Sequence, residues 1–260
     1  MNTMNMKSQR GLGLIELMVA IVLALLLALA MIAIFLSGRA SFLTQEQVGR
    51  LQENGRYAYH LMTTELQRAG YRRASWDPPR MGFAFTANTV NGANDQSDII
   101  ELQYETDRDC FSDFNTVTEN LPQPDGVSTL TVPQFYQKLI RFSVINDQLW
   151  YRCSYGPVNG ALAQQISAPV ADGVENLQIQ YGEDLTRDLS VNQWVDAGAW
   201  NDFSNIVSVR LAMVVRTPEE FTTEADQETF DLYSTTSEAV GDNRIRRVYS
   251  GQVSLRNLTL

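Results

Sequence analysis

The stretch that decides how this chain is organised is Lys7-Ser-Gln-Arg-Gly-Leu-Gly-Leu-Ile-Glu16, which leads into about 22 uncharged residues from Leu17 to Gly38. A helix of that length spans roughly 33 Å at 1.5 Å per residue, and the hydrocarbon core of a bilayer is about 30 Å thick. Backbone polar groups in lipid must pair within the segment, so a single span has to be helical. The sequence therefore predicts a membrane helix over residues 12–38.

The flanking charges predict the orientation of this helix. Lys7 and Arg10 precede the span, and no acidic residue precedes Glu16. Positive charge stays on the cytoplasmic side, so the residues after the helix are expected to be exported. An ordinary signal peptide is the alternative, but its apolar region is only about 7–15 residues long. The residues at the end of the span, Leu36-Ser-Gly-Arg-Ala40, resemble the small-residue cleavage site of a signal peptide only partly.

Glu16 is the unusual residue of the segment. A carboxylate near the end of a membrane helix costs about 1–3 kcal/mol, and less if it reaches the interface. Taken alone, Glu16 is either an interfacial residue that marks the start of the span or a residue with a function in the apolar environment. Its neighbours favour the second interpretation.

The run Arg10-Gly-Leu-Gly-Leu-Ile-Glu16 resembles the cleavage and methylation motif of type IV prepilins. The resemblance implies that a prepilin peptidase cuts after Gly11, that Leu12 becomes the methylated N-terminus, and that Glu16 is the fifth residue of the mature chain. Two positions depart from the family pattern, because Leu12 replaces the usual Phe and Gly13 replaces a typical Thr or Ser.

Cleavage after Gly11 gives Glu16 a physical role. The cut leaves an α-ammonium group beside an apolar helix, and this cation needs a counter-charge when helices bundle. Glu16 of a neighbouring subunit is expected to supply that charge. Because only one axial stagger brings the two charges together, the pair also fixes the register between helices.

The resemblance continues beyond the motif and narrows the family to PilW-type minor pilins. The blocks that carry it are Glu53–Tyr71, Gly173–Tyr181, Val207–Val215 and Arg246–Asn257. The first block lies on an amphipathic continuation of the helix over 39–70. Its apolar residues recur at near-helical spacing, as Val48, Leu51, Ala58, Leu61, Met62, Leu66 and Ala69.

Residues 71–260 are predicted to form one β-rich exported domain, so the fold class is α+β: a long N-terminal helix followed by a mainly antiparallel sheet. Residues 1–11 form the leader. The clearest hairpin joins Lys138–Ile145 to Gln148–Cys153 through Asn146-Asp147. The other predicted strands are Asp98–Tyr104, Val127–Val132, Val174–Tyr181, Val207–Val215 and Arg246–Leu258.

Stretches rich in Gly, Pro, Asn and Asp are predicted to be loops. Trp76-Asp-Pro-Pro-Arg80 should end the helix region, because prolines cannot continue a helix. The other predicted irregular stretches are Thr86–Ser97, Asp113–Gly126, Gly182–Asn205 and the acidic Thr217–Asp242.

Cys110 and Cys153 are the only cysteines. In an exported domain they are expected to form a disulfide, which would stabilise the fold by roughly 4 kcal/mol in the loop-entropy treatment. Two buried free thiols are the alternative.

No catalytic motif emerges from the sequence. His60 is the single histidine and is predicted to be a surface or helix-packing residue, so histidine triads and His-based zinc sites are excluded. We predict no enzymatic activity, no cofactor and no metal. Two acidic groups offer oxygen ligands for calcium without EF-hand spacing, Asp95, Asp98 and Glu101, and Glu183, Asp184 and Asp188.

The net charge of −10, which falls to −12 when Lys7 and Arg10 are removed with the leader, argues against nucleic-acid binding. The local cluster Arg244, Arg246 and Arg247 is interpreted as the solvated start of the last strand.

The leading functional hypothesis is a structural minor pilin in an initiating or tip complex of a type IV pilus. The resemblance implies as partners the prepilin peptidase, other minor pilins, the major pilin, the inner-membrane assembly platform and, before assembly, membrane lipid. The protein would then be a single-pass inner-membrane protein with a periplasmic domain, and reach the pilus after assembly. Two alternatives remain open at this stage: a pseudopilin of a type II secretion system, and a tip adhesin.

Overall fold

The computed structural model describes residues 13–72, 84–92, 96–114, 118–122, 129–158, 160–220, 222, 226–233, 235–238 and 241–257. The chain divides into two compact units, residues 1–46 and residues 47–260. We call these the N-terminal unit and the sheet unit, and each is described by itself. Gly11, Leu12, Asp95 and the segment Trp76–Arg80 lie outside the described residues.

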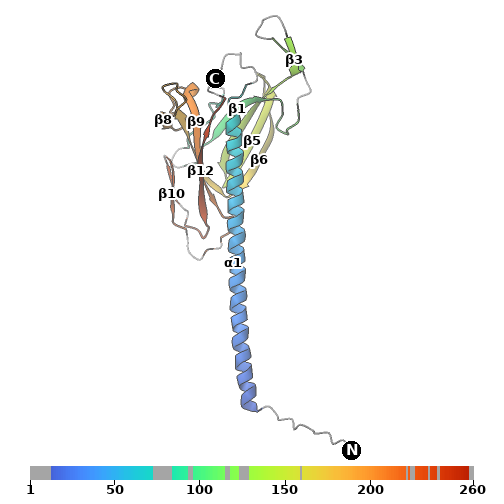
Figure 1. The fold of residues 1–260 in the computed structure, drawn as a ribbon, viewed down its shortest axis with the longest axis vertical. Coiled ribbons are helices and arrows are strands. Elements are labelled where there is room, and N and C mark those ends of the chain that lie inside the picture. Colours follow the sequence, from blue (N-terminus) through green and yellow to red (C-terminus); the bar gives the residue numbers. More distant parts are fainter. Residues whose placement is uncertain are drawn as a thin grey trace, which may run out of the picture. The chain divides into compact units, whose positions relative to one another are not determined.

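A single helix, α1, runs from Leu14 to Arg68 and contributes to both units (Figure 1). No proline interrupts these 55 residues, and alanine and leucine, which have the best helix propensities, dominate the first half. Within the sheet unit the helix buries one stripe of residues. The predicted amphipathic face is present there, and it also includes Gln47, Gly55 and Glu65.

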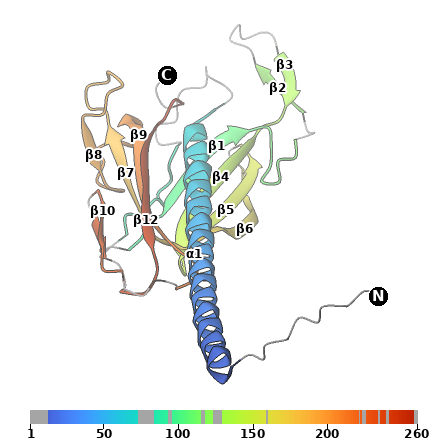
Figure 2. The same ribbon diagram turned by 60° about the horizontal axis from the view of Figure 1, so that its bottom comes forward.

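Two four-stranded antiparallel sheets form the body of the sheet unit (Figures 1 and 2). The first has the order β1-β4-β5-β6, and the second has the order β12-β9-β7-β8. The first sheet comprises β1 (Ile100–Thr106), β4 (Tyr136–Ile145), β5 (Gln148–Pro157) and β6 (Ala163–Asp172). The second comprises β7 (Val174–Glu183), β8 (Gln193–Val195), β9 (Ile206–Arg216) and β12 (Arg246–Ser254). Two hairpins add β2 (Thr118–Pro122) with β3 (Thr129–Pro133), and β10 (Thr229–Leu232) with β11 (Thr235–Glu238).

The turn between β4 and β5 is the one that the sequence predicts most directly. Asn146 and Asp147 have φ of 51° and 56°, which is the left-handed conformation that a two-residue type I′ hairpin turn requires. The strands on either side pair from Ile145 opposite Gln148 to Tyr136 opposite Pro157. The predicted hairpin is confirmed.

The core lies where the helix meets the two sheets. Figure 2 shows α1 passing between β12 on one side and β1 and β4 on the other. Leu51, Met62 and Leu66 of the helix are fully buried against this core. The fully buried side chains that the sheets contribute include Ile100, Leu102, Ile140, Phe142, Leu149, Leu177 and Leu211.

Two reciprocal glycine–tyrosine contacts bring the helix close to β12. A Cβ at Gly55 of the helix would overlap the ring of Tyr249 in β12, and a Cβ at Gly251 of β12 would overlap the hydroxyl of Tyr59 in the helix. Each tyrosine therefore lies over a glycine of the other element. Isolated glycine in a helix is normally destabilising, so Gly55 is explained by this close approach.

Replacing Gly55 by alanine is expected to destabilise the sheet unit by about 1–3 kcal/mol, because the added methyl group displaces the Tyr249 ring from a packed interface. Gly49 is the matched control, since it is exposed on the same helix and a Cβ there has nothing within 4 Å. Gly49→Ala should leave stability unchanged or raise it by about 0.5–1 kcal/mol. Thermal unfolding of the full chain in detergent compares the two. Equal effects of the two substitutions would contradict the packing argument.

The predicted strands Asp98–Tyr104, Val174–Tyr181, Val207–Val215 and Arg246–Leu258 correspond to β1, β7, β9 and β12, and Val127–Val132 overlaps β3. The predicted loops were partly wrong. Asp113–Gly126 contains β2, Gly182–Asn205 contains β8, and Thr217–Asp242 contains β10 and β11. Strand β6 lies in a region where the sequence pattern predicts no element.

Candidate assembly helix and its supporting contacts

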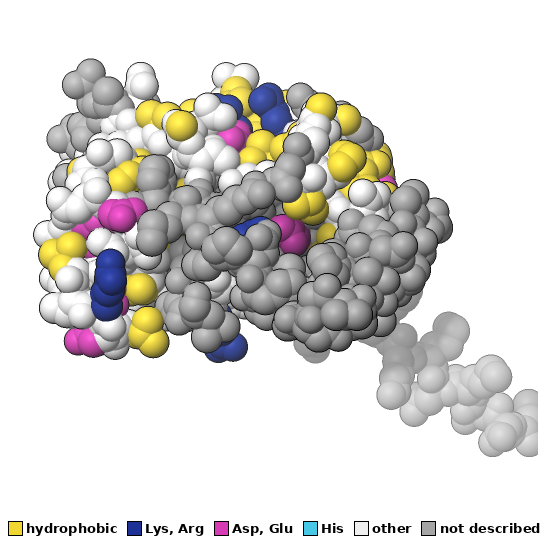
Figure 3. All heavy atoms as spheres, turned by 90° about the horizontal axis from the view of Figure 1, so that it is seen from above, with side chains coloured by type: hydrophobic (Ala, Val, Ile, Leu, Met, Phe, Trp, Pro, Cys, Tyr) yellow, Lys and Arg dark blue, Asp and Glu magenta, His cyan; other side chains and the backbone are white. Residues whose placement is uncertain are grey.

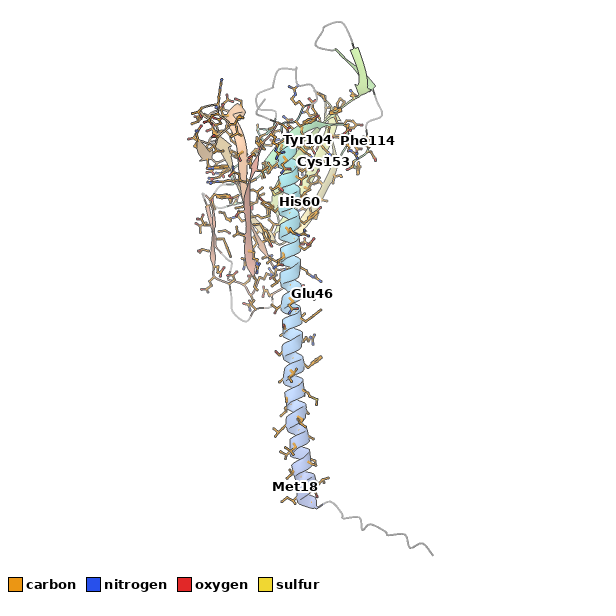
Figure 4. All side chains as sticks on the ribbon, in the orientation of Figure 1. Met18, Glu46, His60, Tyr104, Phe114 and Cys153 are labelled. Carbon is orange, nitrogen blue, oxygen red and sulfur yellow. A yellow bond between two sulfur atoms is a disulfide. The ribbon has the colours of Figure 1, made fainter. Side chains whose placement is uncertain are left out.

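The helix of the N-terminal unit is apolar and exposed along its length among the described residues. Leu14 and Ile15 are each 77% exposed, and the most apolar 18-residue window of the helix has a mean hydropathy of 3.2 with none of it buried. Side chains project from this helix on all sides, as Figure 4 shows around Met18. A helix that is apolar all round needs lipid or other helices around it. By length and composition, α1 is long and apolar enough to cross a membrane.

Glu16 lies in the first turn of this helix. Its backbone N–H and that of Leu17 both donate to the carbonyl of Gly13, at 3.0 and 3.2 Å. The N-terminal end of a helix carries partial positive charge, so a carboxylate in the first turn is favourable there. The Glu16 side chain is exposed, and it is therefore available to a neighbouring chain.

In the sheet unit, polar contacts from β1 and from the residues after β12 hold the C-terminal end of the helix. The hydroxyl of Tyr104 in β1 donates to Glu65 Oε2 at 2.7 Å, and both residues are buried. Burial, together with the charge of Glu65, raises the pKa of the Tyr104 hydroxyl well above its ordinary value. Asn257, just after β12, donates to the carbonyls of Gln67 and Ala69 at 3.0 and 3.3 Å. These contacts fix the end of the helix against β1 of the first sheet and the end of β12 in the second.

The interpretation of Arg246 as a solvated residue is wrong. Its side chain is only 1% exposed and lies within 2.7 Å of both Glu175 and Asp242 and within 3.5 Å of Asp226. Arg216 joins the same cluster through Glu175 at 3.1 Å and Asp147 at 2.8 Å. Arg247, the neighbour of Arg246 in the sequence, is exposed as predicted.

This ion cluster shifts the titration of its members. Burial by itself would lower the pKa of Arg246, but its hydrogen bonds to Glu175 and Asp242 raise that pKa above the ordinary value. Burial would likewise raise the pKa of Asp242, but the hydrogen bond and charge of Arg246 lower it. Both shifts favour the charged forms, so the cluster is a set of mutually stabilising ions.

The acidic stretch Thr217–Asp242 is not irregular throughout. Phe230 and Leu232 of β10 pack on Ala212 and Val214, which lie on the face of β9 that points away from the helix. Asp226 and Asp242 in the same stretch bind Arg246. The described part of this stretch is therefore a cover for the outer face of β9.

Cys110 and Cys153 form a disulfide in the structure, with their Cα atoms 5.9 Å apart. The bond ties the loop after β1 to the middle of β5 (Figure 4). Beside it, the guanidinium of Arg108 lies 3.8 Å from the centre of the Phe114 ring.

Asp98 and Asp184, two of the carboxylates considered as calcium ligands, accept hydrogen bonds from backbone N–H groups of the protein. Asp98 accepts the N–H groups of Gly92 and Ile179, each at 2.7 Å, and burial raises its pKa to about 6. Asp184 accepts four successive backbone N–H groups, from Thr186 to Leu189. Among the described residues, no three His, Cys, Asp or Glu side chains are placed to hold a metal ion.

His60 is exposed on the helix. On the part of the face that Figure 3 colours, single basic and acidic side chains lie with hydrophobic ones between them.

Comparisons with known proteins agree with this geometry. The family described as type IV pilus-assembly protein W matches residues 146–257, and the prokaryotic N-terminal methylation motif matches residues 6–38. No curated protein matches the chain significantly. Among solved structures, a type IV-like pilin from Thermus thermophilus has the same fold, with a TM-score of 0.51 and 13% identity. The match covers 81% of this chain and 98% of that chain.

The first matched range contains β5 to β12, and so includes three of the four blocks on which the family resemblance rests. The second contains the motif around Gly11 and Glu16 and the apolar helix that follows. With the pilin-like arrangement of one long helix and antiparallel sheets, these findings confirm the resemblance. The chain therefore carries a PilW-family region over residues 146–257 and a prepilin methylation motif over residues 6–38, and these support a type IV pilin-like minor pilin of pilus assembly.

Proposed function

We propose that this minor pilin acts in an initiating or tip complex of the pilus, as a structural subunit without enzymatic activity. Prepilin peptidase removes residues 1–11, and residues 12–38 then move from the membrane into a bundle of helices. Residues 39–70 continue the helix, and residues 71–260 form the periplasmic domain that contacts other minor pilins. The observation that supports the proposal most is the apolar helix, whose described side chains are exposed and whose first turn contains a single carboxylate, Glu16.

The physical argument starts from the membrane state. In lipid, a carboxylate close to the apolar segment is costly, and the α-ammonium group left after Gly11 is costly for the same reason. Pairing the Glu16 carboxylate of one subunit with the Leu12 ammonium of the next removes both costs. The membrane state is then the precursor, and the bundle is the stable state.

Deleting the gene and restoring it with variants tests this function. Loss of the chain should abolish or greatly reduce surface pili and twitching, and the parent sequence should restore both. Gly11→Val should not restore them, because a branched side chain before the cut blocks processing and residues 1–11 are retained. Gly13→Ala is the matched control and should be processed normally, since a Cβ there meets nothing within 4 Å.

Other outcomes would contradict the proposal. A Gly11→Val chain that retains residues 1–11 and still restores pili would show that the function does not need processing. Normal pili with failed enzyme export after deletion would instead indicate a secretion pseudopilin. Normal pili with lost adhesion would indicate a tip adhesin.

A further inference from the structure

Strand β12 has one edge whose backbone groups have no partner among the described residues. Leu255 N–H donates to the Val207 carbonyl, and Thr217 N–H donates to the Ile245 carbonyl, so the odd-numbered residues of β12 pair with β9 in this register. In an antiparallel pair, alternate residues direct their N–H and C=O groups to opposite sides. The groups of the even-numbered residues Val248, Ser250, Gln252 and Ser254 therefore point away from the sheet.

Strands β1 and β7 have bonding partners among the described residues on the sides that face away from β4 and β9. On β1, Glu101 O and Gln103 N–H bond to the segment beside it, through Thr86 N–H and the Ala84 carbonyl. On β7, Leu177 and Ile179 bond to Asp98, and Tyr181 and Glu183 pair with β8.

The edge strand β6 has features that prevent the addition of a further strand. It contains Pro169, which has no N–H, and its pairing with β5 shifts register at two places. Proline and bulges are the usual means by which proteins prevent further strand addition. Strand β12 has neither feature over nine residues.

The rest of the described chain does not fill this edge. After β12, Asn257 turns back to the end of the helix and bonds to the carbonyls of Gln67 and Ala69. The β10–β11 hairpin packs on the outer face of β9 at Ala212 and Val214. Val248 is 37% exposed, and Ser250, Gln252 and Ser254 are exposed as well.

We propose that the free edge of β12 binds an extended strand of a different pilin-type subunit, which adds to the sheet by backbone hydrogen bonding. This inference rests on the proposed function. Strand addition to an open edge takes its affinity from main-chain bonds and its specificity from alternate side chains. The added strand would continue the face of Tyr249, Gly251 and Val253, so alternate residues of it should be small or apolar.

The direction of β12 disfavours a second copy of this chain as the occupant. Successive residues of β12 contact successive residues of the helix: Tyr249 lies against Gly55, and Gly251 lies against Tyr59. Beyond the strand, Asn257 bonds to Ala69. Because the residue numbers rise together, β12 runs parallel to the helix. A closed antiparallel pair of two β12 strands would point the two helices in opposite directions. Helices inserted from the same side of one membrane have the same direction. An edge-to-edge contact between β12 and β6 of the next copy meets Pro169.

Ser250→Pro tests the edge. This substitution removes an outward-facing N–H group and the serine hydroxyl, and it leaves the hydrogen bonds between β12 and β9 intact. Ser250→Ala is the control, because it also removes the hydroxyl but keeps the N–H group. Expressed as full chains in the deletion strain, Ser250→Pro should lower surface pili by about tenfold or more relative to Ser250→Ala. The Cys110–Cys153 disulfide and the thermal midpoint of the purified chain report on folding. If both variants are folded and give equal numbers of pili, the proposal is wrong.

A photoreactive residue placed at Gln252, in living cells, identifies the occupant even if Ser250→Pro misfolds. We expect a crosslink to another chain that carries a prepilin motif, and none from the control position Arg152, which is exposed on the central strand β5. A crosslink between two copies of this chain, to a protein without that motif, or none at all would overturn the proposal. These results leave the proposed function standing if deletion still abolishes pili, whereas normal pili after deletion would remove the function itself.

Discussion

Replacing Arg246 by leucine is expected to lower the free energy of unfolding of the sheet unit by about 3–5 kcal/mol. The substitution removes the cation that lies between Glu175, Asp242 and Asp226, and it leaves these three carboxylates largely buried. Breaking a buried ion cluster costs more than the cluster contributes, because the remaining carboxylates have lost both hydration and their buried cation. Glu175 and Asp242 keep only the more exposed Arg216, at 3.1 and 3.8 Å, and Asp242 keeps Arg244 at 3.5 Å. The total stability of a domain is only about 5–15 kcal/mol, so the loss should be visible in abundance as well as in unfolding.

Arg247→Leu is the matched control for this prediction. The two arginines are adjacent in β12, but Arg247 is exposed, so its substitution should change stability by no more than about 0.5 kcal/mol. Chemical denaturation of the full chain in detergent, followed by near-UV circular dichroism, measures both. Equal effects at the two positions would show that the cluster around Arg246 does not stabilise the fold.

The effect of Arg246→Leu should depend on pH. In the parent protein the pKa of Asp242 is lowered, so its contribution to stability is complete above the unfolded pKa of about 4 and disappears as pH falls through the folded pKa. The variant lacks the part of this contribution that Arg246 supplies, and it keeps the part that comes from Arg244. The difference between parent and variant should therefore be largest near neutral pH and shrink in acid.

The features that the sequence predicts well are those encoded locally. The apolar run after Glu16 specifies its helix through length and composition, and Asn146-Asp147 specifies the β4–β5 turn because both residues tolerate the left-handed conformation. Strand β9 alternates apolar residues on the helix-facing side over nearly its whole length. In each case the signal and the structure occupy the same few residues.

The features that the sequence does not predict depend on distant partners. Arg246 is paired with Glu175, which lies 71 residues away in the sequence, and with Asp226, which lies 20 residues away. Because these partners are distant, the local run of arginines predicts a solvated segment. Strand β10 alternates for only four residues within an acidic stretch, and its apolar side chains are recognisable only from the β9 face that they cover. Gly55 was the one available signal of the close contact with β12, because glycine in the middle of a helix needs a reason.

Glu16→Gln is expected to remove most of this subunit from pili while leaving its processing intact. Glutamine keeps the size and most of the hydrogen-bonding capacity of the side chain, and it removes the charge. If the Leu12 ammonium of a neighbour pairs with Glu16 in the apolar bundle, loss of the carboxylate leaves a cation without its partner, at a cost of about 3–5 kcal/mol. That cost corresponds to a fall in incorporation of about two to four orders of magnitude. Immunoblots of sheared pili, normalised to the mature chain in membranes, measure it.

Glu53→Gln is the control, since it makes the same chemical change on the same helix at an exposed position. Glu53 pairs with Arg56 at 2.9 Å on the surface, with side chains 67% and 76% exposed, and solvent screens such pairs strongly. Incorporation of this variant should equal that of the parent. If Glu16→Gln is incorporated equally well, the carboxylate does not dock the helix, and Glu16 is then an interfacial residue that marks where the apolar helix begins. A normal ratio for Glu53→Gln together with a large loss for Glu16→Gln assigns the effect to charge in the apolar bundle, because helix propensity changes equally in the two variants.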